Sequence, residues 1–489
     1  MPAHKAIRKP YQIFVNRNLR LDSITHVGFD MDYTLAVYRK ERIERLAFQE
    51  TIKKLVEMKY PEEILSLKFD PHVMIRGLVI DKKLGNILKM DRFGYVGRAY
   101  HGMRPMSDSE RVEAYSSRRI RISDQRYHSV DTLFDLPETH LYAQLVTFLD
   151  CQSSPGVPDY WQVFDDTRAS LDLSHQDGSI KRPIMKEPER YVIRDRSLAL
   201  ALDRLHEVGK KVFVCTNSEW EYTDRLMQYM LGGALGEYGK WTAYFDRIMV
   251  GSRKPDFFTR TDPFFNLEGK PLVLADLHKH KFLIRGNSQD FQKIEGARGE
   301  QILYIGDHIY GDILRSKKTH GWRTTMIVEE LEHEIQLSHR ARTLNNRLKE
   351  LDLEAHLLDH DRNRLQRRID SIIEVQKGGG ATRRNAFLVG WSPERKSRAL
   401  DSYGEKIKVI DAQVAANLGE RETLQQAYDS TFNSNWGPLM KEKNEISRFG
   451  QQVKNYACLY TGRVTNFLSY STDKVFRSPI DLMPHDHGE

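Results

Sequence analysis

The chain has 489 residues, 40% of them hydrophobic and 29% charged, which is long enough for one large domain or two to three ordinary ones. It has no apolar run long enough to cross a bilayer, and its basic amino terminus lacks the apolar core and cleavage site of a secretory signal. A net charge of +7 is a weak bias at this length and does not favour nucleic acid as a partner. We therefore expect a cytoplasmic protein that does not act on membranes.

The three cysteines, Cys151, Cys215 and Cys458, lie far apart in the sequence and lack the spacing of metal ligands. This usage argues against a disulfide framework and against a zinc site. We expect reduced side chains that serve packing.

Five short apolar runs have the pattern of parallel strands that are buried on both faces. The intervening stretch 197–208 has leucines on one face and stops at Gly209, as an amphipathic helix with a left-handed cap does. Strands that alternate with helices predict an α/β fold with a doubly wound, Rossmann-like parallel sheet. The predicted strands are 24–29, 211–215, 247–250, 302–305 and 323–328.

Interruptions of this alternation divide the chain into four parts. Residues 1–34 and 195–328 form the predicted core, and 35–194 is long enough to fold over it as an inserted cap. From 329 to 430, apolar residues follow three-four spacing among many charges, with a break at Gly378, Gly379 and Gly380. That pattern predicts a helical hairpin, which we interpret as an oligomerisation element. Residues 431–489 are expected to pack on the core.

Asp30 and Asp32 follow the first predicted strand, at the end where open α/β sheets bind ligands. One carboxylate can attack phosphorus, while the other can protonate the leaving oxygen and later activate water. Paired acids in a loop are more often solvated, and some bind calcium. The pair by itself therefore does not establish catalysis.

Two further motifs offer groups that suit a phosphate. Thr216 and Asn217 follow the second strand near a helix start, where they can donate to phosphoryl oxygens or simply cap the helix. Lys254, in Ser-Arg-Lys-Pro, can neutralise charge between a carboxylate and a phosphate, although most loop lysines are only solvated.

Asp307 and Asp312 form a second acidic pair after the fourth strand, with glycines that permit a tight backbone. Two carboxylates at this spacing can hold a hard cation directly and through water. Acidic turns are common, so this motif is also ambiguous alone. The order of acid pair, hydroxyl, lysine and acid pair, each near a strand end, is poorly explained by chance.

That order of motifs resembles the haloacid dehalogenase superfamily. The resemblance implies that Asp30 is the nucleophile and Asp32 the general acid/base. It also implies that Thr216 and Lys254 bind the phosphate, with Asn217 beside them in the catalytic set.

The same resemblance implies Mg²⁺ as the cofactor. Asp30, the backbone carbonyl of Asp32, and Asp307 would hold the ion, with Asp312 in support. Such charge compensation is needed because a phosphate dianion repels a carboxylate nucleophile.

Longer segments are similar to the cytosolic purine 5'-nucleotidases, a family that includes IMP/GMP-specific enzymes. The similarity implies hydrolysis of purine nucleoside 5'-monophosphates, with IMP and GMP preferred, together with phosphate transfer and a homo-oligomeric state. The matching segments are 76–81, 85–89, 131–134, 306–318 and 321–324.

In that family a cap segment reads the nucleotide, and the matching stretch here is 164–181. The resemblance implies that Arg168, Asp172, His175 and Lys181 contact the base or the phosphate. Asp172 can accept from the N1–H of hypoxanthine or guanine, a donor that adenine lacks, while Arg168 and Lys181 suit acceptors and anions. Without the resemblance, this stretch would be interpreted as a surface helix of mixed charge.

Two alternative functions stay open. The first is a phosphatase of the same chemistry that acts on another monoester, such as a sugar phosphate. The second is a binding module in which the basic charge and long helices serve RNA or a protein partner.

Overall fold

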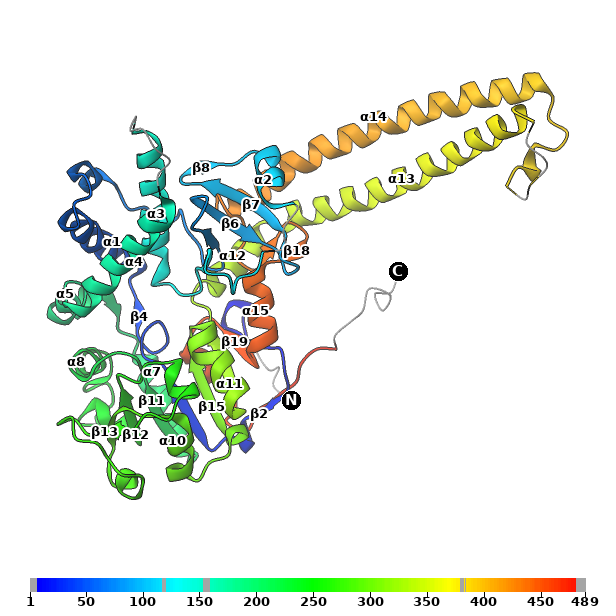
Figure 1. The fold of residues 1–489 in the computed structure, drawn as a ribbon. Helices are drawn as coiled ribbons and strands as arrows, with labels where there is room; N and C mark the ends of the chain where they lie inside the picture. The colour runs from blue at the N-terminus through cyan, green and yellow to red at the C-terminus, as the bar shows by residue number, and fades with distance from the viewer. Residues whose placement is uncertain (1–6, 117–119, 153–158, 379–381, 383, 481–489) are drawn as a thin grey trace. The chain divides into compact units, whose positions relative to one another are not determined.

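The structure is a computed structural model that describes residues 7–116, 120–152, 159–378, 382 and 384–480 (Figure 1). Two compact units make up the chain: one is Met1–Gln336 with Pro438–Glu489, and the other is Leu337–Gly437. Gly379 and Gly380, where a break was predicted, lie outside the described residues. Among the helices that are described, none combines the length and the apolar character needed to span a bilayer.

A nine-stranded sheet forms the centre of the larger unit, in the order β1-β19-β16-β15-β3-β11-β12-β14-β13. All strands from β19 to β14 run parallel, and the two edge strands are antiparallel. The five predicted strands take the order 3-2-1-4-5, which confirms the Rossmann-like doubly wound class. The strands are β1 (Phe14–Val15), β3 (His26–Phe29), β11 (Lys211–Cys215), β12 (Arg247–Val250), β13 (Phe264–Phe265), β14 (Phe282–Arg285), β15 (Ile302–Gly306), β16 (Arg323–Ile327) and β19 (Leu459–Thr461).

The two faces of the sheet bury different apolar clusters, because side chains alternate along each strand. Phe213 and Tyr304 pack with aromatic residues of α9 (Asp256–Thr259) and α10 (Ser288–Glu295). Val27 and Phe29 lie on the other face, near α7 (Arg196–Glu207) and the short helix η9 (Val464–Ser469). Gly28 lies between them in β3, and a Cβ there would come within 2.1 Å of the Phe213 ring. Phe213 lies opposite Gly28 on β11, so a side chain at position 28 would collide with its ring.

Helix α7 corresponds to the helix predicted at 197–208. Its amino terminus is capped by Asp195, whose side chain accepts a hydrogen bond from the Ser197 N–H. Gly209 follows with φ of +74°, which confirms the predicted left-handed cap. Val208 is 47% exposed, so it lies outside the apolar face of the helix.

The chain enters and leaves the cap through a two-stranded ribbon. β4 (Val37–Tyr38) pairs antiparallel with β10 (Val192–Ile193), so that Tyr38 lies opposite Val192. Between these strands, the cap contains an antiparallel sheet of order β8-β7-β6-β5-β9 and several helices (Figure 1). Its elements are α1 (Lys40–Glu57), β5 (Val79–Asp81), β6 (Asn86–Met90), β7 (Val96–His101), β8 (Arg104–Pro105), α2 (Asp108–Tyr115), β9 (Tyr127–Ser129), α3 (Asp135–Asp150), α4 (Tyr160–Gln176), α5 (Lys181–Lys186) and α6 (Pro188–Tyr191).

The carboxyl-terminal segment completes the larger unit. Helix α15 (Arg448–Tyr456) leads into β19, which pairs with β16 and β1. β20 (Val475–Phe476) then pairs with β2 (Leu19–Arg20). Sequence patterns did not reveal β19, because three residues are too few to show a period.

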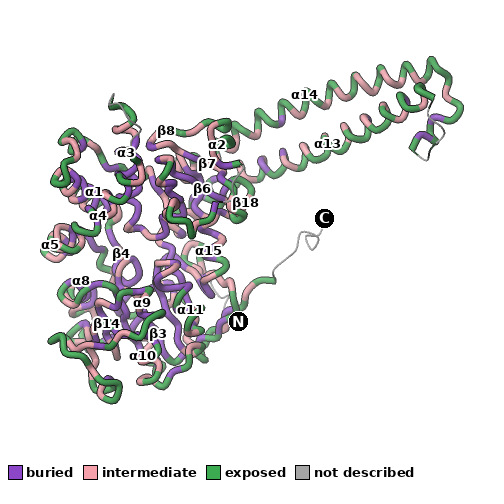
Figure 2. The backbone as a smooth tube through the Cα atoms, in the orientation of Figure 1, coloured by how far each residue is buried: buried purple, intermediate pink, exposed green. Residues whose placement is uncertain are grey.

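The smaller unit is an antiparallel helical hairpin of α13 (Arg342–Gln376) and α14 (Pro393–Phe432), which confirms the predicted fold of this region. Ion pairs link the two helices, with Arg347 at 2.9 Å from Glu420 and Arg362 at 2.6 Å from Asp411. Most of both helices is exposed, as Figure 2 shows. The buried side chains of α13 are Leu348, Leu351, Leu365 and Ile372.

Candidate active site

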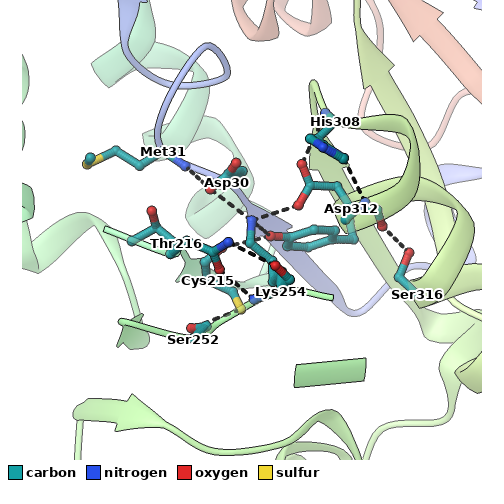
Figure 3. Close-up of polar contacts among 12 residues, drawn as sticks. Asp30, Met31, Cys215, Thr216, Ser252, Lys254, His308, Asp312 and Ser316 are labelled. Carbon is teal, nitrogen blue, oxygen red and sulfur yellow. Dashed lines mark hydrogen bonds and ion pairs between the residues drawn. The ribbon is translucent and has the colours of Figure 1, made fainter. Parts of the chain in front are cut away.

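The four sequence motifs meet at the carboxyl ends of the central strands. Asp30 directly follows β3, Thr216 follows β11, and Asp307 follows β15, while Lys254 lies in the loop after β12. Parallel neighbouring strands end at the same edge of the sheet, so residues far apart in the sequence come together there (Figure 3). The site lies where the strand order reverses, between β3 and β15.

Lys254 is the cation at the centre of this arrangement. Its Nζ lies 2.9 Å from Asp30 Oδ1 and 2.7 Å from Asp312 Oδ1, and it donates to the Tyr304 hydroxyl at 2.9 Å (Figure 3). Burial acts to lower the pKa of Lys254, but the two carboxylates outweigh burial and raise it. Lys254 is therefore a fixed positive charge beside the predicted nucleophile.

Three carboxylates converge beside this lysine. Asp30, Asp307 and Asp312 each offer an oxygen within 4.8 Å of the other two. Asp307 is 4% exposed, and its Oδ2 has no hydrogen-bond partner among the described residues. Burial raises the pKa of Asp30 to about 7 and that of Asp307 well above its usual value. One lysine does not balance three carboxylates, and oxygen donors of this kind suit a hard divalent cation.

Gly306, the last residue of β15, leaves the space that Asp312 occupies. A Cβ at position 306 would lie 2.4 Å from Asp312 Oδ2, the oxygen that accepts a hydrogen bond from the His308 N–H at 3.2 Å. Asp312 itself lies in a π-helical turn, Ile309–Leu314. Such turns are frequent at functional sites, and this one directs the carboxylate back toward β15.

The two residues predicted beside the phosphate have different contacts. Thr216 is fully buried, and its Oγ1 accepts from the Ser218 N–H at 3.1 Å. Asn217 holds the lysine loop: its Nδ2 donates to the Lys254 carbonyl at 2.9 Å, and its Oδ1 accepts from the Lys254 N–H. Asn217 thus fixes the backbone from which Lys254 reaches Asp30.

Hydroxyl groups hold the side chain of Asp32. The Tyr38 hydroxyl donates to Oδ1, and Ser218 Oγ donates to Oδ2 at 2.7 Å. Burial raises the pKa of Asp32, although both hydrogen bonds act to lower it. A carboxyl group with a raised pKa is suited to hold and return a proton. Tyr38 was not predicted, because its sequence context does not distinguish it from an ordinary core tyrosine.

A cavity of about 540 Å³ joins the core residues to the cap. It is lined from the core by Asp32, Asn217 and Ser218, and from the cap by α4 and the start of α5. The structure therefore brings all four predicted substrate residues into one cavity with Asp32: Arg168, Asp172, His175 and Lys181.

Arg168 is already paired within this cavity. Its Nη2 lies 2.8 Å from Glu138 and 3.2 Å from Asp135, both on α3, and 2.9 Å from His128 Nε2. Burial raises the pKa of Glu138 to about 8, although Arg168 acts to lower it. The sequence carries no signal for these three partner roles, because they arise only where α3 and β9 meet α4 in the folded cap.

The other cavity residues remain open to a ligand. Asp172 is exposed on α4. His175 lies edge-on to Phe134, with ring centroids 5.9 Å apart, and burial lowers its pKa to about 4, so it is neutral at physiological pH. Lys181 lies 3.4 Å from Glu219. The cavity thus offers a carboxylate, two flat rings and a cation.

Comparison with known proteins identifies the family. The family model described as the 5' nucleotidase family matches residues 13–488. The chain belongs to this family. A 5'-nucleotidase domain-containing protein of Dictyostelium discoideum is 27% identical over 99% of this chain and 76% of its own length. 5'-Nucleotidase domain-containing protein 2 of Homo sapiens and of Rattus norvegicus are each 28% identical over 97% of this chain, and over 85% and 80% of their own lengths.

Membership of the 5' nucleotidase family makes the chain a phosphoric monoester hydrolase. The solved structure of CbbY from Rhodobacter sphaeroides in complex with phosphate matches 62% of this chain and 86% of its own, with 14% identity and a TM-score of 0.22. That score is low, so the fold assignment rests on the strand order itself.

Proposed function

We propose that this 5'-nucleotidase hydrolyses purine nucleoside 5'-monophosphates in the cytoplasm, with IMP and GMP preferred. The observation that supports this proposal is the single cavity that joins Asp32 to Asp172, His175 and Lys181 of the cap. A phosphate monoester whose phosphorus lies against Asp30 would extend its leaving group past Asp32 into this cavity. A group as large as a nucleoside matches a cavity of about 540 Å³.

The reaction proceeds in two displacements at phosphorus. An oxygen of Asp30 attacks, the bond from phosphorus to the ribose O5' breaks, and the departing oxygen takes a proton from Asp32. Water then attacks the aspartyl phosphate and gives a proton to Asp32, and the bond from phosphorus to Asp30 breaks to release inorganic phosphate. A nucleoside hydroxyl in place of water would give phosphate transfer. Lys254, at 2.9 Å from Asp30, offsets the charge of the approaching dianion.

The carboxylates beside Lys254 fit Mg²⁺. Asp30, Asp307 and the backbone carbonyl of Asp32 would hold the ion, with Asp312 in support. The Oδ2 of Asp307, buried and without a hydrogen-bond partner among the described residues, supports this assignment. When bound, the ion supplies positive charge that lets a phosphate dianion approach a carboxylate.

Asp172 is proposed to set the preference for 6-oxopurines. Its carboxylate can accept from the N1–H of hypoxanthine or guanine, which adenine lacks. Arg168, which is paired with Asp135 and Glu138, and Lys181 can donate to ring acceptors or to phosphate. The rings of Phe134 and His175 offer flat surfaces to the base.

Asp30→Asn tests the chemistry. The substitution keeps the size of the side chain but removes the nucleophile, so release of phosphate from IMP with Mg²⁺ should fall by at least about 10³-fold. Removal of divalent cations by a chelator should abolish wild-type activity, and added Mg²⁺ should restore it. Asp165→Asn, on the exposed side of α4, is the matched control and should leave activity unchanged. Wild-type activity in the Asp30 variant would refute the proposal.

Asp172→Ala separates nucleotides from other monoesters. The variant should lower kcat/KM for IMP and GMP by about tenfold or more, a loss of about 1.4 kcal/mol. Its kcat/KM for a sugar phosphate should stay within about twofold, because such a substrate has no N1–H. Asp165→Ala on the same helix is the control. Equal losses for both substrates, or a wild-type enzyme that prefers the sugar phosphate, would favour the phosphatase of other monoesters.

A further inference from the structure

We propose that Tyr38 is a positioning residue for Asp32, which ties the orientation of the general acid/base to the ribbon that connects core and cap. This inference rests on the proposed function, because it assigns Tyr38 a task in the same reaction.

Two hydroxyls from different parts of the fold fix the two oxygens of Asp32. Ser218, in the core loop after β11, donates to Oδ2 at 2.7 Å, and Tyr38, in β4 of the ribbon, donates to Oδ1. The Tyr38 oxygen also lies 2.9 Å from the hydroxyl of Tyr222 on α8 (Trp220–Leu231). Rotation of the Asp32 carboxyl group would break one of these bonds. The hydrogen bonds from Tyr38 and Ser218 therefore set which oxygen of Asp32 faces the leaving group.

Burial alone does not require a hydroxyl at position 38. Tyr38 is 1% exposed, and a phenylalanine would fill the same space without a polar group. A buried hydroxyl without a partner destabilises the folded state, and the Asp32 carboxyl group accepts from this one, beside the Tyr222 hydroxyl. Orientation of Asp32 gives the hydroxyl a function that packing does not.

Aromatic contacts extend from Tyr38 to the substrate cavity. The Tyr38 ring lies edge-on to Tyr33, with centroids 4.9 Å apart, and Tyr33 lies edge-on to Phe134 at 4.7 Å. Phe134 lines the cavity beside His175. Tyr33 and Phe134 thus connect the wall of the cavity with the residue that orients Asp32.

The ribbon carries both connections between core and cap. The ribbon has two paired positions, and Tyr38 lies opposite Val192 in one of them. The next residue, Arg39, donates its N–H to the Tyr191 carbonyl. The pairing of these strands holds Tyr38 in place beside Asp32. Asp32 is then correctly oriented only while the ribbon holds Tyr38 in this position.

Leaving groups of different basicity test this role. The value of kcat/KM covers the steps up to departure of the leaving group, and a ribose oxygen needs a proton at that stage whereas p-nitrophenolate does not. In the full-length protein, Tyr38→Phe should lower kcat/KM for IMP by about tenfold, chiefly through kcat. The value for p-nitrophenyl phosphate should change by less than about twofold. Ser218→Ala should show the same selectivity and provides a second variant.

Tyr60→Phe is the matched control. The Tyr60 hydroxyl donates to Asp166 Oδ2 at 2.8 Å, so this variant removes the same kind of hydrogen bond elsewhere in the cap. It should leave both substrates unaffected. Equal losses for IMP and p-nitrophenyl phosphate in the Tyr38 variant, or a change in KM alone, would overturn the inference. Full activity of Asp30→Asn would instead refute the proposed function, so the two failures are distinguishable.

Discussion

Glu44, on the cap helix α1, is a buried carboxyl group without a hydrogen-bond partner among the described residues. It is 2% exposed. Burial raises its pKa to about 8; Lys40 opposes this shift, while the charges of Glu329 and Glu330 add to it. In the folded protein Glu44 therefore keeps its proton at neutral pH, whereas in the unfolded chain it ionises near pH 4.5.

This difference makes the free energy of unfolding depend on pH. Between about pH 4.5 and 8 the folded state binds the proton and the unfolded state does not, so stability falls as pH rises through this window. Glu44→Gln should leave stability unchanged near pH 4.5 and should raise the free energy of unfolding at pH 8.5 by at least about 1 kcal/mol. Urea unfolding of the variant and of the wild-type protein at the two pH values measures this difference in the free energy of unfolding.

The exposed Glu57 at the end of the same helix provides the control, because its side chain is 65% exposed and stays solvated. Glu57→Gln should shift stability by a similar small amount at both pH values. If Glu44→Gln also showed no difference between them, burial of an uncompensated carboxyl group would be the wrong description of this site.

At the residue scale, the sequence predicted the groups that belong to compact local motifs. Asp30, Lys254, Asp307 and Asp312 each follow a strand end, and parallel strands bring such ends together without further information. Tyr38 could not be predicted in the same way. Its partner Asp32 is close in sequence, but the contact depends on how the ribbon places β4 beside the core.

At the element scale, length and periodicity determine what can be predicted. The core strands β11 and β15 have five residues each, and the long helices α13 and α14 repeat their apolar pattern over many turns. Such strands and helices can therefore be predicted from the sequence. The two-residue strands β1 and β13 show no period. In the cap, β7 places buried residues three apart rather than alternately, which obscures its strand pattern.

The ribbon of β4 and β10 shows the same limit with a functional consequence. Each strand contributes two residues, and 153 residues of the chain lie between the paired Tyr38 and Val192. Pairing over such a distance is set by the fold of the cap between them. The element that we propose to orient Asp32 was therefore visible only in three dimensions.

At the scale of the whole molecule, chemistry and the helical hairpin belong to different units. Every residue that lines the substrate cavity and each carboxylate of the cluster lies within Met1–Gln336. The hairpin unit, Leu337–Gly437, is held by its own contacts, including the hydrogen bond from Asn417 to the Leu351 carbonyl at 3.1 Å. This division predicts that the hairpin is dispensable for the reaction.

A deletion tests both this prediction and the proposed role of the hairpin in a homo-oligomer. The carboxylate of Glu334, on α12 (Leu331–Arg340), accepts from the N–H groups of Leu439 and Met440 at 2.9 Å each, so the chain leaves and re-enters the larger unit at adjacent points. A short glycine-serine linker in place of 342–434 can therefore close the gap.

The deletion variant should keep kcat/KM for IMP within about threefold. Its mass by light scattering should fall to that of a monomer, because removing the hairpin removes the surface proposed for self-association. A variant of unchanged oligomeric mass would place that surface in the larger unit, and a folded but inactive variant would show that the reaction depends on the hairpin.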